Sequence, residues 1–110
     1  MTAAASSDRG QAAALTVAGS DSGGNAGIQA DLRTFHGFGV HGCTAIAALT
    51  AQNPAGVAAI VPVDGAFLAS QLDAIFACYE IRAVKTGMLA GLELIETTTN
   101  QLTTHPTIPI

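Results

Sequence analysis

Short apolar runs alternate with amphipathic stretches along most of the chain. The first run, LTVAG (residues 15–19), is partly β-branched and ends in glycine, a pattern typical of a strand buried on both faces. After a glycine-rich loop, Ile28, Leu32 and Phe35 recur at helical spacing, and the turn GFGVHG (37–42) follows them. The chain is therefore predicted to begin with a strand, a loop and an amphipathic helix.

A second strand, a turn and a third strand are predicted next. The apolar run CTAIAALTAQ (43–52) stops at NPAG (53–56), where proline and glycine indicate a turn. The run VAAIVPV (57–63) is typical of a short strand, and Pro62 favours a position at the sheet edge or the strand end.

The remaining residues continue the alternation. Asp64 can cap a helix, IRAVKTGM (81–88) is predicted as a strand with a glycine exit, and LELIETTTNQL (92–102) as a helix weakened by its threonines. TIPI (107–110) has the pattern of the first residues of a further strand. The helix capped by Asp64 has an apolar stripe of Phe67, Leu68, Leu72, Ile75 and Phe76.

This alternation predicts the fold class. Strands that alternate with helices of about ten to fifteen residues indicate βαβ units, so we expect an α/β protein with a mainly parallel sheet. Ligands of such sheets bind at the carboxyl ends of the strands. That rule selects the loop 19–27, Gln52 with Asn53, and the segment 86–91.

Composition limits the size and the partners of the protein. Of 110 residues, 49% are apolar and 11% charged, so the chain has more to bury than one small domain usually carries, which hints at an incomplete fold. The net charge of −4 and the scarcity of aromatic residues disfavour nucleic acid and acidic membranes as partners.

The two cysteines and the N-terminus favour a cytoplasmic protein. Cys43 and Cys78 lack the spacing of a zinc site or a disulfide framework and are expected to be buried thiols. Residues 1–13 lack the apolar core of a signal peptide and are expected to be a flexible start. No later apolar run is long enough to cross a bilayer without being interrupted by Gly, Pro or a charge.

Candidate chemistry centres on the glycine loop AGSDSGGNAGIQAD (18–31). A helix N-terminus after it would favour polar or anionic ligand atoms, but the loop matches neither the P-loop nor the dinucleotide-binding spacing. Its glycines fit a close approach of a ligand and a tight turn equally well. Asp21 and Asp31 favour a ligand, because their carboxylates can accept hydrogen bonds from its N–H or O–H groups or from metal-bound water. Asp31 also suits a solvated helix face.

Three more side chains stand at predicted strand ends. Gln52 presents one acceptor and two donors in a plane, which suits the edge of an aminopyrimidine or a pyridine, and capping of a turn is its alternative role. Met88 is either ordinary core or a side chain on the face of a flat ring. Lys85 is interpreted as a strand-end cation, because the order of its neighbours is inverted relative to a P-loop.

Four segments, taken in order, resemble the N-terminal part of the hydroxymethylpyrimidine and phosphomethylpyrimidine kinases of thiamine biosynthesis, members of the ribokinase-like superfamily. They are ALTVAGSDSGGNAGIQADLRTF (14–35), GVHGCTAIAALTAQN (39–53), QLDAIF (71–76) and VKTGML (84–89). The resemblance implies a three-layer ribokinase-like α/β fold. Residues 14–110 would be its N-terminal part, with the C-terminal half absent.

The resemblance also implies a pyrimidine pocket. Gln52 would hold the aminopyrimidine edge, Met88 and Ala26 would flank the ring, and Asp31 would accept a hydrogen bond near the hydroxymethyl or amino group. Together with Gly19, these are the implied substrate-binding residues.

For the full-length enzyme, the resemblance implies ATP-dependent phosphorylation of 4-amino-5-hydroxymethyl-2-methylpyrimidine and then of its monophosphate. The sites of ATP, Mg²⁺ and the catalytic base are expected in the C-terminal half, so the fragment is expected to be inactive alone. A homodimer is compatible with the full-length enzyme. Asn25 stands where the family usually has glycine, and asparagine tolerates a left-handed backbone better than most residues.

Three other functions compete with this one. A pyridoxine or pyridoxal kinase of the same superfamily also takes a flat ring with a hydroxymethyl group. A non-catalytic binding or assembly fragment is the alternative outside enzymes. A dinucleotide-binding oxidoreductase is disfavoured, because Gln52 replaces the expected acidic residue and the glycine spacing differs.

Overall fold

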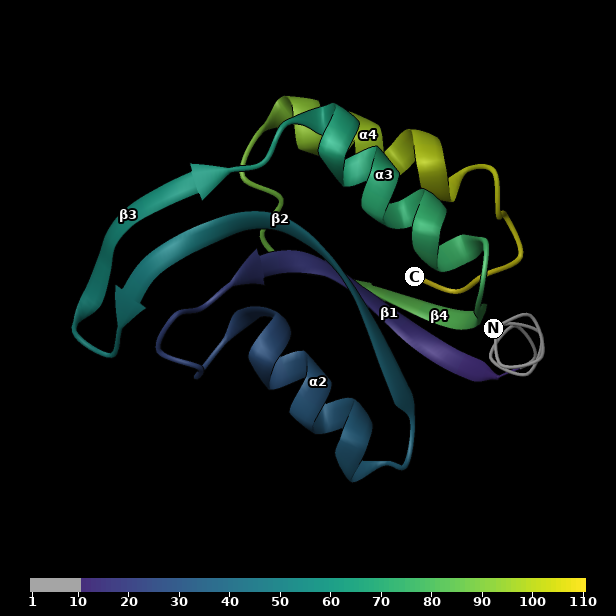
Figure 1. Ribbon diagram of the computed structural model, residues 1–110, viewed down its shortest axis with the longest axis horizontal. Helices are drawn as coiled ribbons and strands as arrows, with labels where there is room; N and C mark the ends of the chain where they lie inside the picture. Colours follow the sequence, from purple (N-terminus) through teal and green to yellow (C-terminus); the bar gives the residue numbers. More distant parts are fainter. Residues whose placement is uncertain (1–10) are drawn as a thin grey trace.

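Helices cover both faces of a four-stranded sheet in the computed structural model, which describes residues 11–110 (Figure 1). The strands are β1 (Ala12–Ser20), β2 (His41–Asn53), β3 (Gly56–Pro62) and β4 (Glu80–Thr86). The helices are α2 (Gly27–Gly37), α3 (Gly65–Phe76) and α4 (Leu92–Leu102). Helix α2 lies on one face of the sheet, and α3 and α4 pack together on the other, which makes three layers.

The strand order is β3-β2-β1-β4, so β1 lies in the interior of the sheet. β1 pairs in parallel with β2 and with β4, whereas β2 and β3 form an antiparallel hairpin. The carboxyl ends of β1, β2 and β4 therefore meet at one edge of the sheet. The predicted mainly parallel α/β sheet is confirmed, and Pro62 ends the edge strand β3, where its missing N–H is tolerated.

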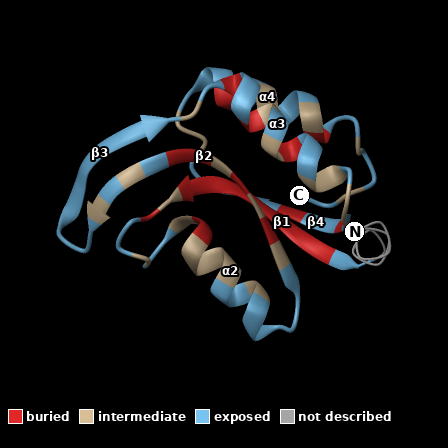
Figure 2. Ribbon diagram, viewed as in Figure 1, coloured by how far each residue is buried: buried red, intermediate tan, exposed pale blue. Residues whose placement is uncertain are grey.

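β1 is buried on both faces along most of its length (Figure 2). Leu15 and Val17 are fully buried in a cluster that includes Leu68 of α3 and Leu94 of α4. Thr16 points to the opposite face, where its hydroxyl group reaches α2. A strand covered on both faces needs side chains that tolerate burial at nearly every position, and the sequence of β1 provides them.

Small residues of β2 let the helices approach the sheet closely. Cys43, Ala45 and Ala47 are buried in the cluster that α3 and α4 cover. On the other face, a Cβ atom at Gly42 would lie 2.6 Å from Leu32 Cδ2 of α2, which is too close for two carbon atoms. Glycine at this position therefore permits the packing of α2 on β2.

Two polar side chains complete the hydrogen bonding around α3. Asp64 caps the helix as predicted, since its Oδ1 accepts from the Phe67 N–H at 2.7 Å. Gln71 bonds to both backbone groups of Ile46 in β2, accepting from its N–H at 2.8 Å and donating to its carbonyl oxygen at 3.0 Å. Because β3 pairs with β2 only from Ala48 onward, Gln71 takes the place of a neighbouring strand at Ile46.

The apolar stripe of α3 is narrower than the sequence predicts. Phe67 is 57% exposed, because it lies about 100° around the helix from buried Leu68, outside the arc that faces the sheet. Cys78, just after α3, is only half-buried, whereas Cys43 in β2 is buried as predicted. Both thiols are free.

Both ends of the chain differ from their predictions. The predicted flexible start, residues 1–13, lies outside the described residues except for its last three, of which the final two already belong to β1. TIPI (107–110) forms no strand, although the Val84 N–H of β4 donates to the Pro109 carbonyl oxygen at 2.9 Å. Proline cannot donate to a ladder, so this segment runs beside β4 without regular pairing.

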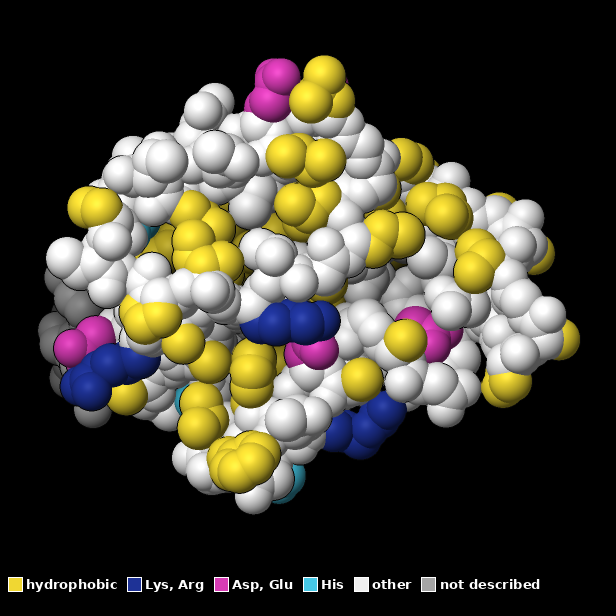
Figure 3. Space-filling view, turned by 180° about the vertical axis from the view of Figure 1, so that it is seen from behind, with side chains coloured by type: hydrophobic (Ala, Val, Ile, Leu, Met, Phe, Trp, Pro, Cys, Tyr) yellow, Lys and Arg dark blue, Asp and Glu magenta, His cyan; other side chains and the backbone are white. Residues whose placement is uncertain are grey.

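Apolar side chains are exposed on parts of the surface (Figure 3). Phe38 after α2, Val61 in β3 and Leu92 in α4 are each more than half exposed, and every residue of β3 is exposed. β3 therefore adds little to the core and is held mainly by its pairing with β2. No helix among residues 11–110 has the length and apolar character needed to cross a membrane.

Leu72→Ala is expected to lower the free energy of unfolding by about 2–5 kcal/mol, because a fully buried side chain is lost and a cavity is left. Phe67→Ala on the same helix removes a side chain that is 57% exposed and should cost clearly less. Urea unfolding followed by circular dichroism compares the two variants. If both variants lost the same free energy of unfolding, the assignment of Leu72 to the core and of Phe67 to the surface would be contradicted.

Candidate functional site

Three loops meet in a cavity of about 250 Å³ at the carboxyl ends of β1, β2 and β4. They are the glycine loop after β1, the end of β2, and the segment that leaves β4. We call this space the loop cavity. Its lining includes Gly19, Ala26, Gln52 and Met88. The convergence that a parallel sheet predicts is confirmed.

Asp21 holds the glycine loop in shape. It is only 4% exposed, and its carboxylate accepts three backbone hydrogen bonds. Oδ1 accepts from the Gly23 N–H at 2.8 Å, and Oδ2 accepts from the N–H groups of Asn25 and Ala26 at 2.9 and 2.8 Å. The loop itself thus uses both oxygens of Asp21, and acceptance of a hydrogen bond from a ligand stays a prediction.

The hydrogen bonds of Asp21 also set its ionisation. Burial raises the pKa of the carboxyl group, but the three N–H groups and the charge of Arg33 lower it and together outweigh burial. The pKa of Asp21 therefore lies below its usual value, and the side chain is ionised at neutral pH. A carboxylate beside the N-terminus of α2 also interacts favourably with the helix dipole.

Glycine is required where the loop enters α2. Gly27 has a φ of +60°, and a Cβ atom there would collide with the Gly19 carbonyl oxygen. The Gln29 side chain supports the same junction: its Oε1 accepts from the Asp21 N–H at 2.9 Å, and its Nε2 donates to Ser20 Oγ at 2.8 Å. The loop is thus a built structure, and its glycines serve the turn at this point.

Asn25 needs no left-handed backbone in this loop. Within residues 11–110, Ala90 is the non-glycine residue with a positive φ, at 65°, and Asn25 is not. The Asn25 N–H is fixed by its bond to Asp21. Asparagine therefore fits this position without the conformational freedom of glycine.

Gln52 lies near the end of β2, at a bulge that begins after Ala51. Its backbone N–H donates to Ser22 Oγ and its carbonyl oxygen accepts from that hydroxyl, both at 2.7 Å. Thr50 Oγ1 lies 3.2 Å from Gln52 Oε1 but only 2.7 Å from the Ser20 carbonyl oxygen, which takes its single proton more readily. The backbone of Gln52 therefore anchors the loop, and its carboxamide is only weakly engaged.

Met88 lies beside the glycine loop and not in the core. It is 44% exposed, and its Cε would lie 2.9 Å from a Cβ atom at Gly19. Ala26, just before α2, lines the same cavity. The core alternative for Met88 is therefore excluded, and its thioether spans from the segment after β4 to the end of β1.

Asp31 is not among the described residues that line the loop cavity. It faces the sheet, where its Oδ2 accepts from Thr16 Oγ1 at 2.6 Å and from Lys85 Nζ at 3.0 Å. Its side chain is 14% exposed, so the solvated alternative is excluded. Lys85 lines the cavity instead. The position of Lys85 just before the glycine exit of β4 could have indicated from the sequence that it reaches the cavity. Nothing in the sequence indicated that Asp31 is its partner.

The loop cavity is bordered by apolar groups that could contact a flat ring and by a few polar groups. Backbone atoms, a thioether, a carboxamide and an ammonium group border it, which suits a small heteroaromatic ligand. Among residues 11–110, no cluster of three or more His, Cys, Asp or Glu side chains is placed to hold a metal ion. The arrangement can bind and orient a ring, and it holds no nucleophile with an adjacent base.

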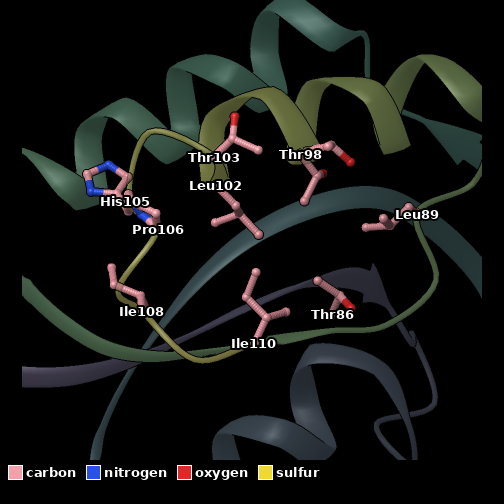
Figure 4. Close-up of a pocket in the computed structure, with 10 residues that line it drawn as sticks. Thr86, Leu89, Thr98, Leu102, Thr103, His105, Pro106, Ile108 and Ile110 are labelled. Carbon is pink, nitrogen blue, oxygen red and sulfur yellow. The ribbon is translucent and has the colours of Figure 1, made fainter.

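A larger cavity of about 430 Å³ lies between α4, the end of β4 and the C-terminal residues (Figure 4). Leu102 and Ile110 point into it from opposite sides. Its polar side chains are threonines and His105, whose ring stacks on Phe76 at 4.0 Å between centroids. This space lacks the charged and amide groups of the loop cavity and is an apolar gap between elements.

The sequence profile of the family described as phosphomethylpyrimidine kinase matches residues 21–110. The chain belongs to this family. A relative from Rhizobium meliloti, named hydroxymethylpyrimidine/phosphomethylpyrimidine kinase, is 51% identical over 84 residues, which are 76% of this chain and 32% of that protein. The chain thus spans about a third of the length of this curated kinase.

Solved structures of the family and its neighbours share the fold. A phosphomethylpyrimidine kinase from Clostridium difficile gives a TM-score of 0.82 at 42% identity, over 87% of this chain and 41% of that chain. A pyridoxal kinase from Bacillus subtilis, solved as an ADP complex, gives 0.80 at 37% identity, over 87% and 38%. The predicted ribokinase-like fold is confirmed for the part of the kinase family that this chain represents.

Asp21→Asn is expected to destabilise the chain at neutral pH, because an amide offers one acceptor oxygen where three N–H groups converge. Ionised Asp21 stabilises the fold fully above its unfolded-state pKa of about 3.9, and this is lost as the pH falls through the lower folded-state pKa. The difference in unfolding free energy between wild type and variant should therefore narrow below about pH 4.

Urea unfolding at a series of pH values measures this difference. Glu96→Gln removes a carboxylate from an exposed position of α4 and is the control. If both variants followed the same pH dependence, the shape of the glycine loop would not depend on the charge of Asp21.

Proposed function

We propose that this chain supplies the pyrimidine-binding part of a kinase of thiamine biosynthesis. The whole kinase would transfer a phosphoryl group from ATP to 4-amino-5-hydroxymethyl-2-methylpyrimidine and then to its monophosphate. The observation that carries the proposal is the loop cavity, where Gln52 and Met88 meet at the carboxyl ends of three strands. The name of the Rhizobium meliloti relative supports the choice of substrate.

A flat aminopyrimidine matches the groups around the loop cavity. Gln52 would hold the ring edge, because its planar carboxamide offers one acceptor and two donors and is only weakly engaged within the chain. Met88 would lie against one face of the ring through its polarisable thioether, and Ala26 and Gly19 would border it. Asp31 would accept a hydrogen bond near the hydroxymethyl or amino group through its Oδ1, since its Oδ2 already accepts from Thr16 and Lys85.

The ATP side of the reaction is proposed to lie in the part of the relatives that this chain does not cover. Residues 11–110 contain no P-loop sequence and no cluster of three or more His, Cys, Asp or Glu side chains placed to hold a metal ion. In phosphoryl transfer, placement of the acceptor contributes much of the rate. The residues described here would therefore bind the pyrimidine and place its hydroxymethyl oxygen.

Gln52→Ala is expected to weaken binding of the hydroxymethylpyrimidine about tenfold and to change ATP binding less than about twofold, since the lost amide serves only the pyrimidine. The variant is made in a chimera of this chain with the remainder of the Rhizobium meliloti kinase, and isothermal titration calorimetry measures both ligands. Gln101→Ala is the matched control, because that amide bonds to Asp73 outside the loop cavity. Comparable losses for both ligands would refute the role of Gln52.

Pyridoxal is a second candidate acceptor, because the Bacillus subtilis pyridoxal kinase shares this part of the fold. In the same chimera, kcat/KM for the hydroxymethylpyrimidine is expected to exceed that for pyridoxal by at least about tenfold, since the rings present different hydrogen-bonding edges to Gln52. Equal or faster turnover of pyridoxal would count against the thiamine assignment. Turnover of neither would favour a non-catalytic binding or assembly role.

A further inference from the structure

The loop cavity contains one basic side chain that the proposed function leaves without a role. Among the residues that line the cavity, Lys85 is the basic one and Asp21 the acidic one. The carboxylate of Asp21 is occupied by three backbone N–H groups. Lys85 is therefore the side chain in this cavity that can meet a negatively charged group of a ligand.

We infer that Lys85 positions the phosphate group of phosphomethylpyrimidine, the acceptor in the second phosphorylation. The inference rests on the proposed function and deepens it, because it names the residue that would recognise the charged form of the substrate. Lys85 would be a substrate-binding residue, and Asp31 and Thr16 would position it.

Two poorly accessible residues fix the ammonium group. Lys85 Nζ donates to Asp31 Oδ2 at 3.0 Å, and the same oxygen accepts from Thr16 Oγ1 at 2.6 Å. Thr16 is fully buried, and the Asp31 side chain is 14% exposed, whereas that of Lys85 is 49% exposed. The ammonium is thus held at the border between the sheet and the cavity. Because the long Lys85 side chain is already ordered, ligand binding would cost less conformational entropy.

The sheet register and a glycine bring the ammonium to the cavity. Lys85 of β4 lies beside Thr16 of β1 in the parallel pairing, so both reach the α2 side of the sheet, where Asp31 lies. A Cβ atom at Gly87 would lie 3.3 Å from Lys85 Nζ and 2.8 Å from Ala18 Cβ. The ammonium therefore lies close to the strand exit, where glycine leaves room for it.

The chemistry of an ammonium group distinguishes the two acceptors. It has three N–H bonds, and within residues 11–110 Asp31 accepts one of them. The others can donate to phosphate oxygens, and such charge-assisted bonds are about twice as strong as neutral ones. The hydroxymethyl group of the first acceptor is neutral and gains much less from the same contact. Lys85 would therefore favour the monophosphate.

Equilibrium dialysis of the purified 110-residue chain with each pyrimidine tests this inference. Lys85→Met is expected to weaken binding of phosphomethylpyrimidine about tenfold or more and that of the hydroxymethylpyrimidine less than about twofold. Lys85→Arg keeps the charge and should retain most of the affinity for the monophosphate. Arg82→Met removes a charge from the same strand at an exposed position paired with Glu80, and it should change neither affinity.

The outcomes separate the inference from the proposed function. Equal weakening of both ligands by Lys85→Met, or weakening of neither, would overturn the role of Lys85 while the pyrimidine site stands. Failure of the wild-type chain to bind either pyrimidine would overturn both. If circular dichroism shows that Lys85→Met is unfolded, the salt dependence of the wild type decides, since only monophosphate binding should weaken as KCl is raised. Equal salt dependence of the two ligands would reject the inference.

Discussion

The burial of β1 between β2 and β4 is the constraint on which the rest of the structure depends. Its side chains contact α3 and α4 on one face and α2 on the other, so it cannot shift without disturbing every layer. Because both of its pairings are parallel, three strands end at the same edge of the sheet. The loops that follow them have to meet there, and the loop cavity is a direct consequence of this pairing.

The two aspartates near this edge form different bonds within the chain. Other polar side chains are therefore left to contact a ligand. Asp21 satisfies the N–H groups of the glycine loop, and Asp31 holds Lys85. Asp21 therefore serves its own loop through both oxygens, and Asp31 is tied to Thr16 and Lys85 through Oδ2. The weakly engaged carboxamide of Gln52 and the ammonium of Lys85 remain, and these two groups suit a polar ring edge and an anionic substituent. Stability and recognition thus use separate side chains at the same edge of the sheet.

Local patterns predicted the elements well, and contacts between distant residues were not predictable. Helix α4 begins and ends where its apolar spacing indicates, and the meeting of the three loops follows from the rule for parallel sheets. The partner of Asp31 could not be found, because Lys85 is 54 residues away and the contact depends on the register of β1 with β4. The role of Asp21 depends on the folded path of its own loop, which composition does not specify.

The bond between Gln71 and Ile46 has a consequence for how the sheet can be extended. Strand borders with open N–H and carbonyl groups are templates for adding another strand. At Ile46 a side chain from α3 occupies both groups, so this residue of β2 has no open backbone group for pairing with another chain. On the opposite border, Val84 of β4 bonds to the carbonyl oxygen of Pro109. At these two positions the chain itself takes up backbone groups that an added strand would need, one through a side chain and one through its C-terminal segment.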